Sequence, residues 1–189
     1  MITLKFLINL LCFKKGETYT FNKGVNLVVG DQGTGKSTLL DCLGNYDEKK
    51  VSIKSTGLER TLFLDFEKDN PRLNSHYSNP LDLMLRFQSH GESAKHLFSF
   101  VDHEDNKDTI MILDEPDMAL SIRSCHDLAK RLKKYHEEGR CIIMSAHNPI
   151  IISSMENVLS VEHKKWMTSK EFIESHMKPK KSNTKKKIK

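Results

Sequence analysis

Apolar residues along the chain gather into short continuous runs and one long periodic stripe. Two runs, at 110–113 and 141–144, contain no charged or strongly polar residue. Such runs are typical of parallel strands that are buried on both faces of a sheet. A third run, at 25–29, is rich in valine and ends at a glycine. We predict it as another strand, with two further strands at 18–21 and 61–66.

Between the runs at 110–113 and 141–144, apolar residues recur every three or four positions. This spacing predicts an amphipathic helix that ends at Gly139. Shorter helices are predicted at 38–43 and 81–87, with a loop at 67–80. The predicted apolar stripe of the long helix consists of Leu120, Ile122, Cys125, Leu128, Ala129, Leu132 and Tyr135.

The first apolar segment, Phe6 to Phe13, is flanked by Lys5 and Lys14. It is far too short to span a bilayer, and no small-residue cleavage site follows it. We therefore predict a buried strand here, followed by a turn at 14–17, rather than a targeting segment.

Alternation of buried strands with amphipathic helices predicts an α/β fold, with a mostly parallel sheet flanked by helices. The 189 residues, of which 38% are hydrophobic, suffice for one domain with its own core. We expect this domain to cover residues 1–177 and a disordered basic tail to cover residues 178–189.

The charge of the chain is concentrated in that tail. The formal net charge is +5, but seven lysines lie in the last twelve residues, so residues 1–177 hold 23 basic and 25 acidic side chains. The domain therefore lacks the basic surface that is typical of a dedicated nucleic-acid binder. The tail is either an arm attracted to phosphate backbones and anionic surfaces or a solubilising end.

Four cysteines, Cys12, Cys42, Cys125 and Cys141, lie far apart in the sequence. They form no CxxC pair, and no histidine stands at zinc-ligand spacing from them. The pattern indicates neither a disulfide framework nor a structural metal site, and a reducing, cytoplasmic setting is expected.

The segment after the run at 25–29 matches the phosphate-binding motif GxxxxGK[ST] at every fixed position. It also stands between a predicted strand and a predicted helix, as this motif requires. Its glycines allow backbone N–H groups to face the phosphates, Lys36 reaches the β- and γ-phosphates, and the Ser37 hydroxyl ligates Mg²⁺. The predicted ATP-binding residues of this loop are Gly30, Asp31, Gln32, Gly33, Thr34, Gly35, Lys36, Ser37 and Thr38.

The run at 110–113 leads into two adjacent carboxylates, Asp114 and Glu115, followed by Pro116. Alone, such a pair can be a polar strand exit. Together with the phosphate-binding motif, it predicts that Asp114 holds Mg²⁺ through its water shell and that Glu115 orients and deprotonates the attacking water.

These motifs resemble those of ABC-type ATPases. Residues 114–116 and 119–121 are similar to the Walker B motif and D-loop, most closely in the branch that includes SMC-like DNA-repair heads and OLD-type ATPases. Residues 144–149 resemble the switch strand and histidine of that branch, and residues 89–93 resemble its degenerate signature loop. In size and motifs, the chain is similar to small stand-alone ATPases, designated AAA, of bacteria and their phages.

The resemblance implies a dimer in which the signature loop of one subunit closes on the γ-phosphate bound by the other. Ser89 and Gly91 would then contact ATP in trans, and His147 would sense the γ-phosphate and position Glu115. On the residues alone, the segment at 89–92 can equally be a turn with a helix N-cap. His147 can equally be a polar residue that leaves a buried strand.

The chain also departs from the transporter ATPases. Only 52 residues separate Lys36 from Ser89, too few for a large helical subdomain or an SMC coiled-coil arm. No glutamine occupies the Q-loop position, where Glu67 is either a replacement Mg²⁺ contact or part of a surface loop. Phe13 and Lys14 are candidates to stack on adenine by position alone.

The sequence thus predicts ATP binding and Mg²⁺-dependent hydrolysis by an ATP-switched dimer that drives or licenses a protein partner, in DNA maintenance or phage–host conflict. Nucleic acid is a candidate partner of the tail, and no membrane insertion is expected. The alternatives are an ATP-holding regulatory module, a transport-coupling subunit and a small-molecule kinase. Intact Glu115 disfavours the regulatory module, and the absent Q-loop disfavours the transport-coupling subunit. The lack of an arginine-bearing lid disfavours the kinase.

Overall fold

The computed structural model describes residues 1–57, 60–65, 102, 108–118 and 120–177. The predicted loop at 67–80 and helix at 81–87 lie outside the described residues. Glu67, Ser89 and Gly91 also lie outside the described residues.

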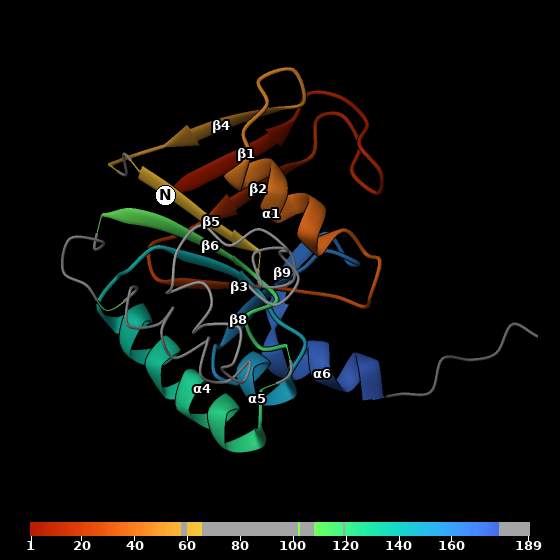
Figure 1. The fold of residues 1–189 in the computed structure, drawn as a ribbon. Coiled ribbons are helices and arrows are strands. Elements are labelled where there is room, and N and C mark those ends of the chain that lie inside the picture. Colours follow the sequence, from red (N-terminus) through yellow and green to blue (C-terminus); the bar gives the residue numbers. More distant parts are fainter. Residues whose placement is uncertain (58–59, 66–101, 103–107, 119, 178–189) are drawn as a thin grey trace, which may run out of the picture.

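A six-stranded sheet forms the centre of the described fold (Figure 1), in the order β5-β6-β7-β3-β8-β9. Its first five strands pair in parallel, and β9 pairs antiparallel with β8. The predicted α/β fold with a mostly parallel sheet is confirmed. The strands are β3 (Val25–Val29), β5 (Arg60–Asp65), β6 (Thr109–Asp114), β7 (Ile142–Ser145), β8 (Asn157–Ser160) and β9 (Lys165–Thr168).

Structural layers cover both faces of this sheet (Figure 1). One face carries α4 (Ile122–Glu137), α5 (Pro149–Ile152) and α6 (Ser169–Met177). The other carries α1 (Lys36–Gly44) and a small antiparallel sheet in the order β2-β1-β4. The strands of the small sheet are β1 (Ile2–Phe6), β2 (Thr18–Phe21) and β4 (Val51–Ser55).

Strand β6 shows why the apolar runs have no polar interruption. Met111 and Leu113 pack into the core on the α4 side of the sheet, whereas Ile110 and Ile112 pack into the core on the α1 side. Because both faces of the strand are covered, the four positions 110–113 between its polar ends are all apolar. β7 follows the same rule.

The long helix α4 begins one residue after Ser121, whose hydroxyl accepts a hydrogen bond from the Ser124 N–H at 3.1 Å. This N-cap supplies a partner for a backbone donor at the helix start. The helix ends before Gly139, whose φ of 70° is the left-handed conformation common after a helix C-terminus. Ile122 is 72% exposed, so its inclusion in the apolar stripe was wrong.

The predicted strand from Phe6 to Phe13 is also wrong. Strand β1 ends at Phe6, and the following residues fold into a loop in which Leu10 and Phe13 exchange backbone hydrogen bonds of 2.9 Å. Leu11, inside the apolar run, is 84% exposed. The strand itself alternates, with Ile2 and Leu4 buried, because a strand of this small antiparallel sheet needs an apolar residue only on its covered face.

Within the described part of the chain, no helix has both the length and the apolar character needed to cross a membrane.

Candidate functional site

The carboxyl ends of the parallel strands bring the predicted site residues to one edge of the large sheet. The phosphate-binding loop follows β3, Glu115 follows β6, and His147 lies two residues after β7. Strand β7 lies between β3 and β6 in the sheet, so the three loops are neighbours. Ligands of open parallel sheets bind at this edge.

Helix α1 starts from the loop without a side-chain cap among the described residues. Its N-cap residue is Gly35, in the left-handed conformation with a φ of 102°, and its first turn has no acidic residue. The N-terminal N–H groups and the positive end of the helix dipole therefore remain open to an anion. A Cβ atom at Gly35 would lie 2.3 Å from the Cys12 sulfur and 3.2 Å from the Phe13 ring, and the positive φ adds backbone strain for any larger residue.

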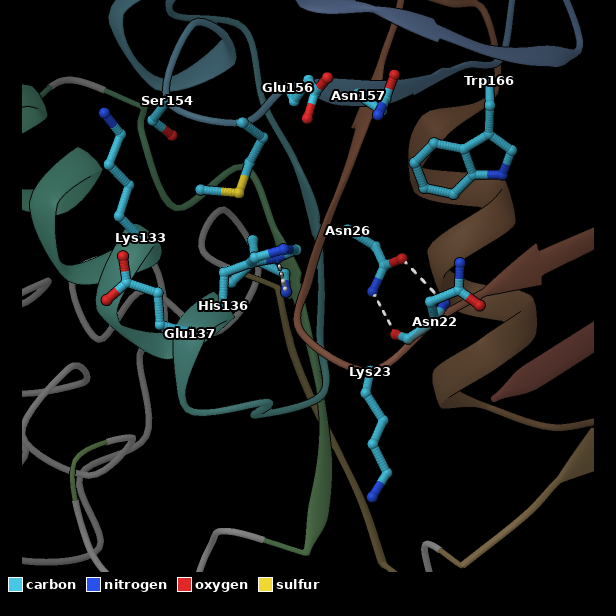
Figure 2. Close-up of a pocket in the computed structure, with 12 residues that line it drawn as sticks. Asn22, Lys23, Asn26, Lys133, His136, Glu137, Ser154, Glu156, Asn157 and Trp166 are labelled. Atoms are coloured by element: carbon cyan, nitrogen blue, oxygen red, sulfur yellow. Dashed lines mark hydrogen bonds between the residues drawn. The ribbon is translucent and has the colours of Figure 1, made fainter.

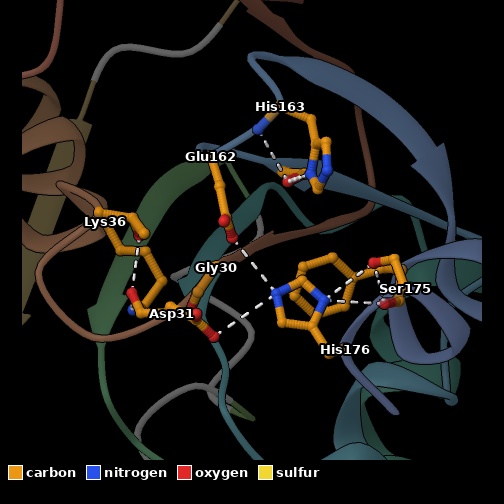
Figure 3. A network of polar contacts seen from close by, with 10 residues as sticks. Gly30, Asp31, Lys36, Glu162, His163, Ser175 and His176 are labelled. Atoms are coloured by element: carbon orange, nitrogen blue, oxygen red, sulfur yellow. Dashed lines mark hydrogen bonds and ion pairs between the residues drawn. The ribbon is translucent and has the colours of Figure 1, made fainter. Parts of the chain in front are cut away.

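Lys36 lies across its own loop in the structure (Figure 3). Its Nζ atom donates hydrogen bonds to the carbonyl oxygens of Gly30 and Asp31, at 3.0 and 3.1 Å. Burial lowers the pKa of Lys36, and the nearby carboxylates of Glu115 and Asp114 oppose that shift. The ammonium group is thus held at the loop by weak carbonyl acceptors, which a phosphate group can replace.

The predicted magnesium ligands Ser37 and Asp114 come together. Asp114 is only 5% exposed, and its burial raises the pKa of its carboxyl group. Hydrogen bonds from the Ser145 and Ser37 hydroxyls lower that pKa in part, and the Ser145 bond is 2.7 Å long. A hydroxyl beside a buried carboxylate is a hard-oxygen donor set that fits Mg²⁺, whose charge would also offset the burial of Asp114.

Glu115 and His147 are in contact, with 3.1 Å between Oε1 and Nε2. Glu115 adopts a φ of 54°, a conformation that costs a non-glycine residue about 1–2 kcal/mol. Its N–H donates to the Ser145 hydroxyl at 2.7 Å, and that hydroxyl donates to Asp114. Ser145 therefore fixes the Asp114 carboxylate and the Glu115 backbone, and the strained backbone turns the Glu115 side chain toward His147.

Asp117 is a site residue to which the sequence reasoning assigned no role. Its Oδ2 atom accepts hydrogen bonds from the N–H groups of His147 and Asn148, at 2.9 and 2.8 Å. The residue is 7% exposed, and its Oδ1 atom is buried without a hydrogen-bond partner among the described residues. Asp117 thus ties the loop after β6 to the loop after β7. Its only sequence signal is a third carboxylate within four positions of Asp114.

Asp65 is a second residue without a predicted role. It ends β5 directly opposite Asp114 in the parallel ladder, and it is 7% exposed. Its negative charge contributes to the raised pKa of Asp114. With Glu67 outside the described residues, Asp65 is the acidic group that the end of β5 brings toward the predicted magnesium ligands.

The prediction that Phe13 stacks on adenine is wrong. Phe13 is 1% exposed, and its ring stacks on Phe6 with 4.4 Å between centroids, so it belongs to the core. Lys14 is exposed, and its role stays a prediction. A hollow of about 330 Å³ beside the loop has a different lining, which includes Leu10, Leu11, Ser37, Thr38 and Asp41.

A larger hollow, of about 550 Å³, is lined in part by the turn that leads into β3 (Figure 2). Several of its polar groups already have partners. The Asn26 amide donates to the Asn22 carbonyl at 2.9 Å, and His136 Nδ1 accepts from the Val25 N–H at 3.1 Å. The Trp166 indole donates to the Thr20 carbonyl at 3.2 Å. These contacts hold the turn, so we do not assign a ligand to this hollow.

Comparison with known proteins agrees with this fold. The protein-family model described as "AAA domain" matches residues 6–189. One similar solved structure is an inward-facing conformation of a putative metal-chelate type ABC transporter. The match has 18% identity and a TM-score of 0.62, and it covers 89% of this chain and 83% of that chain. At this identity the likeness shows the fold, an α/β P-loop NTPase fold of the ABC-ATPase type. No curated protein matches the sequence.

Proposed function

Because the chain belongs to the AAA domain family of P-loop ATPases, we propose that it binds ATP with Mg²⁺ at the carboxyl edge of the large sheet and hydrolyses it there. The contact between Glu115 and His147, beside the loop that carries Lys36, is the observation that supports hydrolysis most directly. A carboxylate that touches an imidazole at this edge is suited to accept a proton from water.

The proposed phosphate contacts come from the backbone N–H groups of residues 30–38 and from Lys36. Ser37 and Asp114 are the proposed residues that hold Mg²⁺, with Asp65 as an outer contact in the place assigned to Glu67. When bound, the ion neutralises charge on the phosphates. The proposed nucleoside position is the hollow beside Ser37.

In the proposed reaction, Glu115 accepts the proton of the attacking water at its carboxylate. His147 keeps the Glu115 side chain in place through their 3.1 Å contact and approaches the γ-phosphate. Ser145 and Asp117 act through these residues, because they fix the two backbone segments that carry them.

The proposed active form is a cytoplasmic dimer that forms with ATP and drives or licenses a partner protein, in DNA maintenance or phage–host conflict. Ser89 and Gly91 are the proposed trans contacts to the γ-phosphate. This part of the proposal rests on the motif at 89–93 and on the open edge at which helix α1 begins.

Glu115→Gln tests the proposal, because it should stop phosphate release while ATP still binds. With ATP and Mg²⁺, light scattering should then show a stable dimer, because the γ-phosphate remains in place between two subunits. Ser89→Arg in the same background should block the dimer and leave ATP binding to the monomer intact. Lys36→Ala is the matched control, since it should abolish ATP binding in a calorimetric titration.

The outcomes separate the parts of the proposal. Wild-type phosphate release from Glu115→Gln would reject its role in hydrolysis. A Glu115→Gln protein that stays monomeric with saturating ATP would reject the dimer and leave a monomeric ATPase. A wild-type protein that binds ATP without releasing phosphate would be a regulatory module that only holds the nucleotide.

A further inference from the structure

The last turn of α6 lies against the phosphate-binding loop (Figure 3). There, His176 faces Asp31 of that loop and Glu162, which follows β8. Its Nε2 atom lies 3.5 Å from Asp31 Oδ1 and 3.3 Å from Glu162 Oε2. One ligand atom from each of the three residues falls within 4.8 Å of the others. Three elements far apart in the sequence thus present two carboxylates and one imidazole to a single point.

The contacts of the other ring nitrogen of His176, Nδ1, determine how the ring is oriented toward the two carboxylates. Its Nδ1 atom lies 2.9 Å from the Phe172 carbonyl oxygen. Because a carbonyl oxygen only accepts, Nδ1 carries the hydrogen. The Ser175 hydroxyl donates to the same carbonyl at 2.7 Å, so its own lone pairs are available to the ring N–H. A carbonyl acceptor at one ring nitrogen is the outer-shell arrangement common to metal-binding histidines, and it leaves Nε2 facing the two carboxylates.

Nε2 lies at hydrogen-bond distance from Glu162 and at ion-pair distance from Asp31, and a metal ion shared by the three groups accounts for the same arrangement. A proton on Nε2 would form charge-assisted hydrogen bonds, which are about 2.7–2.9 Å long. Lys164 with Glu17 at 2.5 Å and Arg140 with Glu138 at 2.7 Å show that ion pairs in this protein do reach short distances. The separations of 3.3 and 3.5 Å around His176 are longer. They match a metal ion with bonds of about 2.0–2.2 Å, which holds tetrahedral ligand atoms about 3.3 Å apart.

We propose that Asp31, Glu162 and His176 bind a zinc ion that ties the C-terminal helix α6 to the phosphate-binding loop. One imidazole and two carboxylates suit Zn²⁺, and the two carboxylates balance its charge. Mg²⁺ prefers an all-oxygen octahedral shell, so this site is distinct in chemistry from the one proposed at Ser37 and Asp114. The sequence indicated no structural metal site because these ligands follow no local spacing.

Isothermal titration of the nucleotide-free full chain with Zn²⁺ tests the site. The wild type should bind one ion, and His176→Ala and Glu162→Gln should each weaken binding by more than about tenfold. Co²⁺ as a second probe should give visible absorption bands typical of tetrahedral coordination in the wild type only. Zn²⁺ should also raise the melting temperature of the wild type but not of His176→Ala.

Two control variants complete the experiment. His163→Ala removes a neighbouring imidazole, 6.5 Å from the His176 ring between centroids, and should bind Zn²⁺ like the wild type. Glu115→Gln, which removes the proposed hydrolysis, should also bind normally, so the zinc site and the ATPase proposal can fail separately. If the wild type does not bind Zn²⁺ at a one-to-one ratio, the proposed site is overturned. Unchanged binding by both His176→Ala and Glu162→Gln, or a loss with His163→Ala alone, would overturn it as well.

Discussion

Asp117 determines where His147 stands, because both N–H groups that anchor the loop after β7 donate to one of its oxygen atoms. Asp117→Ala should lower the kcat of ATP hydrolysis by about 100-fold, as expected for a displacement of about 1 Å at the chemistry. The KM for ATP should change little, since the phosphate-binding loop is untouched. Asp117→Asn keeps an acceptor oxygen and should restore most of the activity. Steady-state phosphate release measures both constants, and a raised KM with an unchanged kcat would exclude the positioning role.

Asp114 costs the nucleotide-free protein stability, because burial raises its carboxyl pKa above the ordinary value of 3.8. A raised pKa in the folded state means that the charged form destabilises the fold at neutral pH. The penalty decreases as the pH falls through the raised pKa and is absent below the ordinary value. Asp114→Asn should therefore stabilise the protein at pH 7 by about 1 kcal/mol, or about 2–4 °C in melting temperature. The gain should shrink toward pH 4, and Mg²⁺-dependent hydrolysis should be lost.

Thermal melts across that pH range check the Asp114 prediction. Asp127→Asn is the control, because this carboxylate is exposed on α4 and its removal should give no such gain. A destabilised Asp114→Asn protein at pH 7 would mean that its hydrogen bonds from Ser145 and Ser37 outweigh the burial of the charge.

The sequence predicted the site residues whose spacing a motif fixes, and it missed those that act across loops. Lys36 and Ser37 follow the glycine loop at set positions, and Asp114 follows its strand directly. Asp117, in contrast, bonds to the backbone 30 and 31 residues away, and Ser145 bonds 31 residues away to Asp114. Without the sheet order, nothing in the sequence indicates that these loops are neighbours.

The sequence predicted those helices and strands whose hydrophobic pattern follows from burial alone. Strands β3, β6 and β7 are covered on both faces and α4 on one stripe, so their patterns are unambiguous. Strand β4 was missed because, among the described strands, it pairs only with β1, and of its own residues only Val51 is buried. Strand β9 lies at the sheet edge without a fully buried residue, and it was missed for the same reason.

The contact between α1 and β5 depends on Gly44 at the end of the helix. A Cβ atom there would lie 2.6 Å from Phe63 Cβ and 2.5 Å from Cγ, atoms close to the β5 backbone that cannot easily move. Gly44→Ala should therefore destabilise the fold by about 1–3 kcal/mol, as measured by urea unfolding. Phe63→Gly removes both obstructing atoms, so the double variant should be more stable than the sum of the two single effects. Additive effects would exclude the clash.

At the scale of the whole molecule, the excess of basic over acidic side chains is concentrated in residues 178–189 of the sequence. Removal of residues 178–189 deletes seven lysines and should leave ATP hydrolysis unchanged. Binding to duplex DNA should weaken, and its dependence on salt should flatten, because fewer counterions are released. Fluorescence anisotropy at several salt concentrations measures both effects. Equal affinity of the full and shortened chains at low salt would assign the tail a solubilising role.

Helices α4 and α5 begin with side-chain caps from Ser121 and Asn148, whereas α1 begins at Gly35 with no cap from any residue that the structure describes. The triphosphate of the proposed ligand, ATP, would accept the hydrogen bonds from the first N–H groups of α1 that a side-chain cap would otherwise accept. Folding and nucleotide binding would then be thermodynamically coupled, because the ligand completes the first turn of the helix. Amide protons at the start of α1 should exchange faster with solvent when the nucleotide leaves. The free energy of unfolding would therefore rise with the nucleotide concentration around the protein.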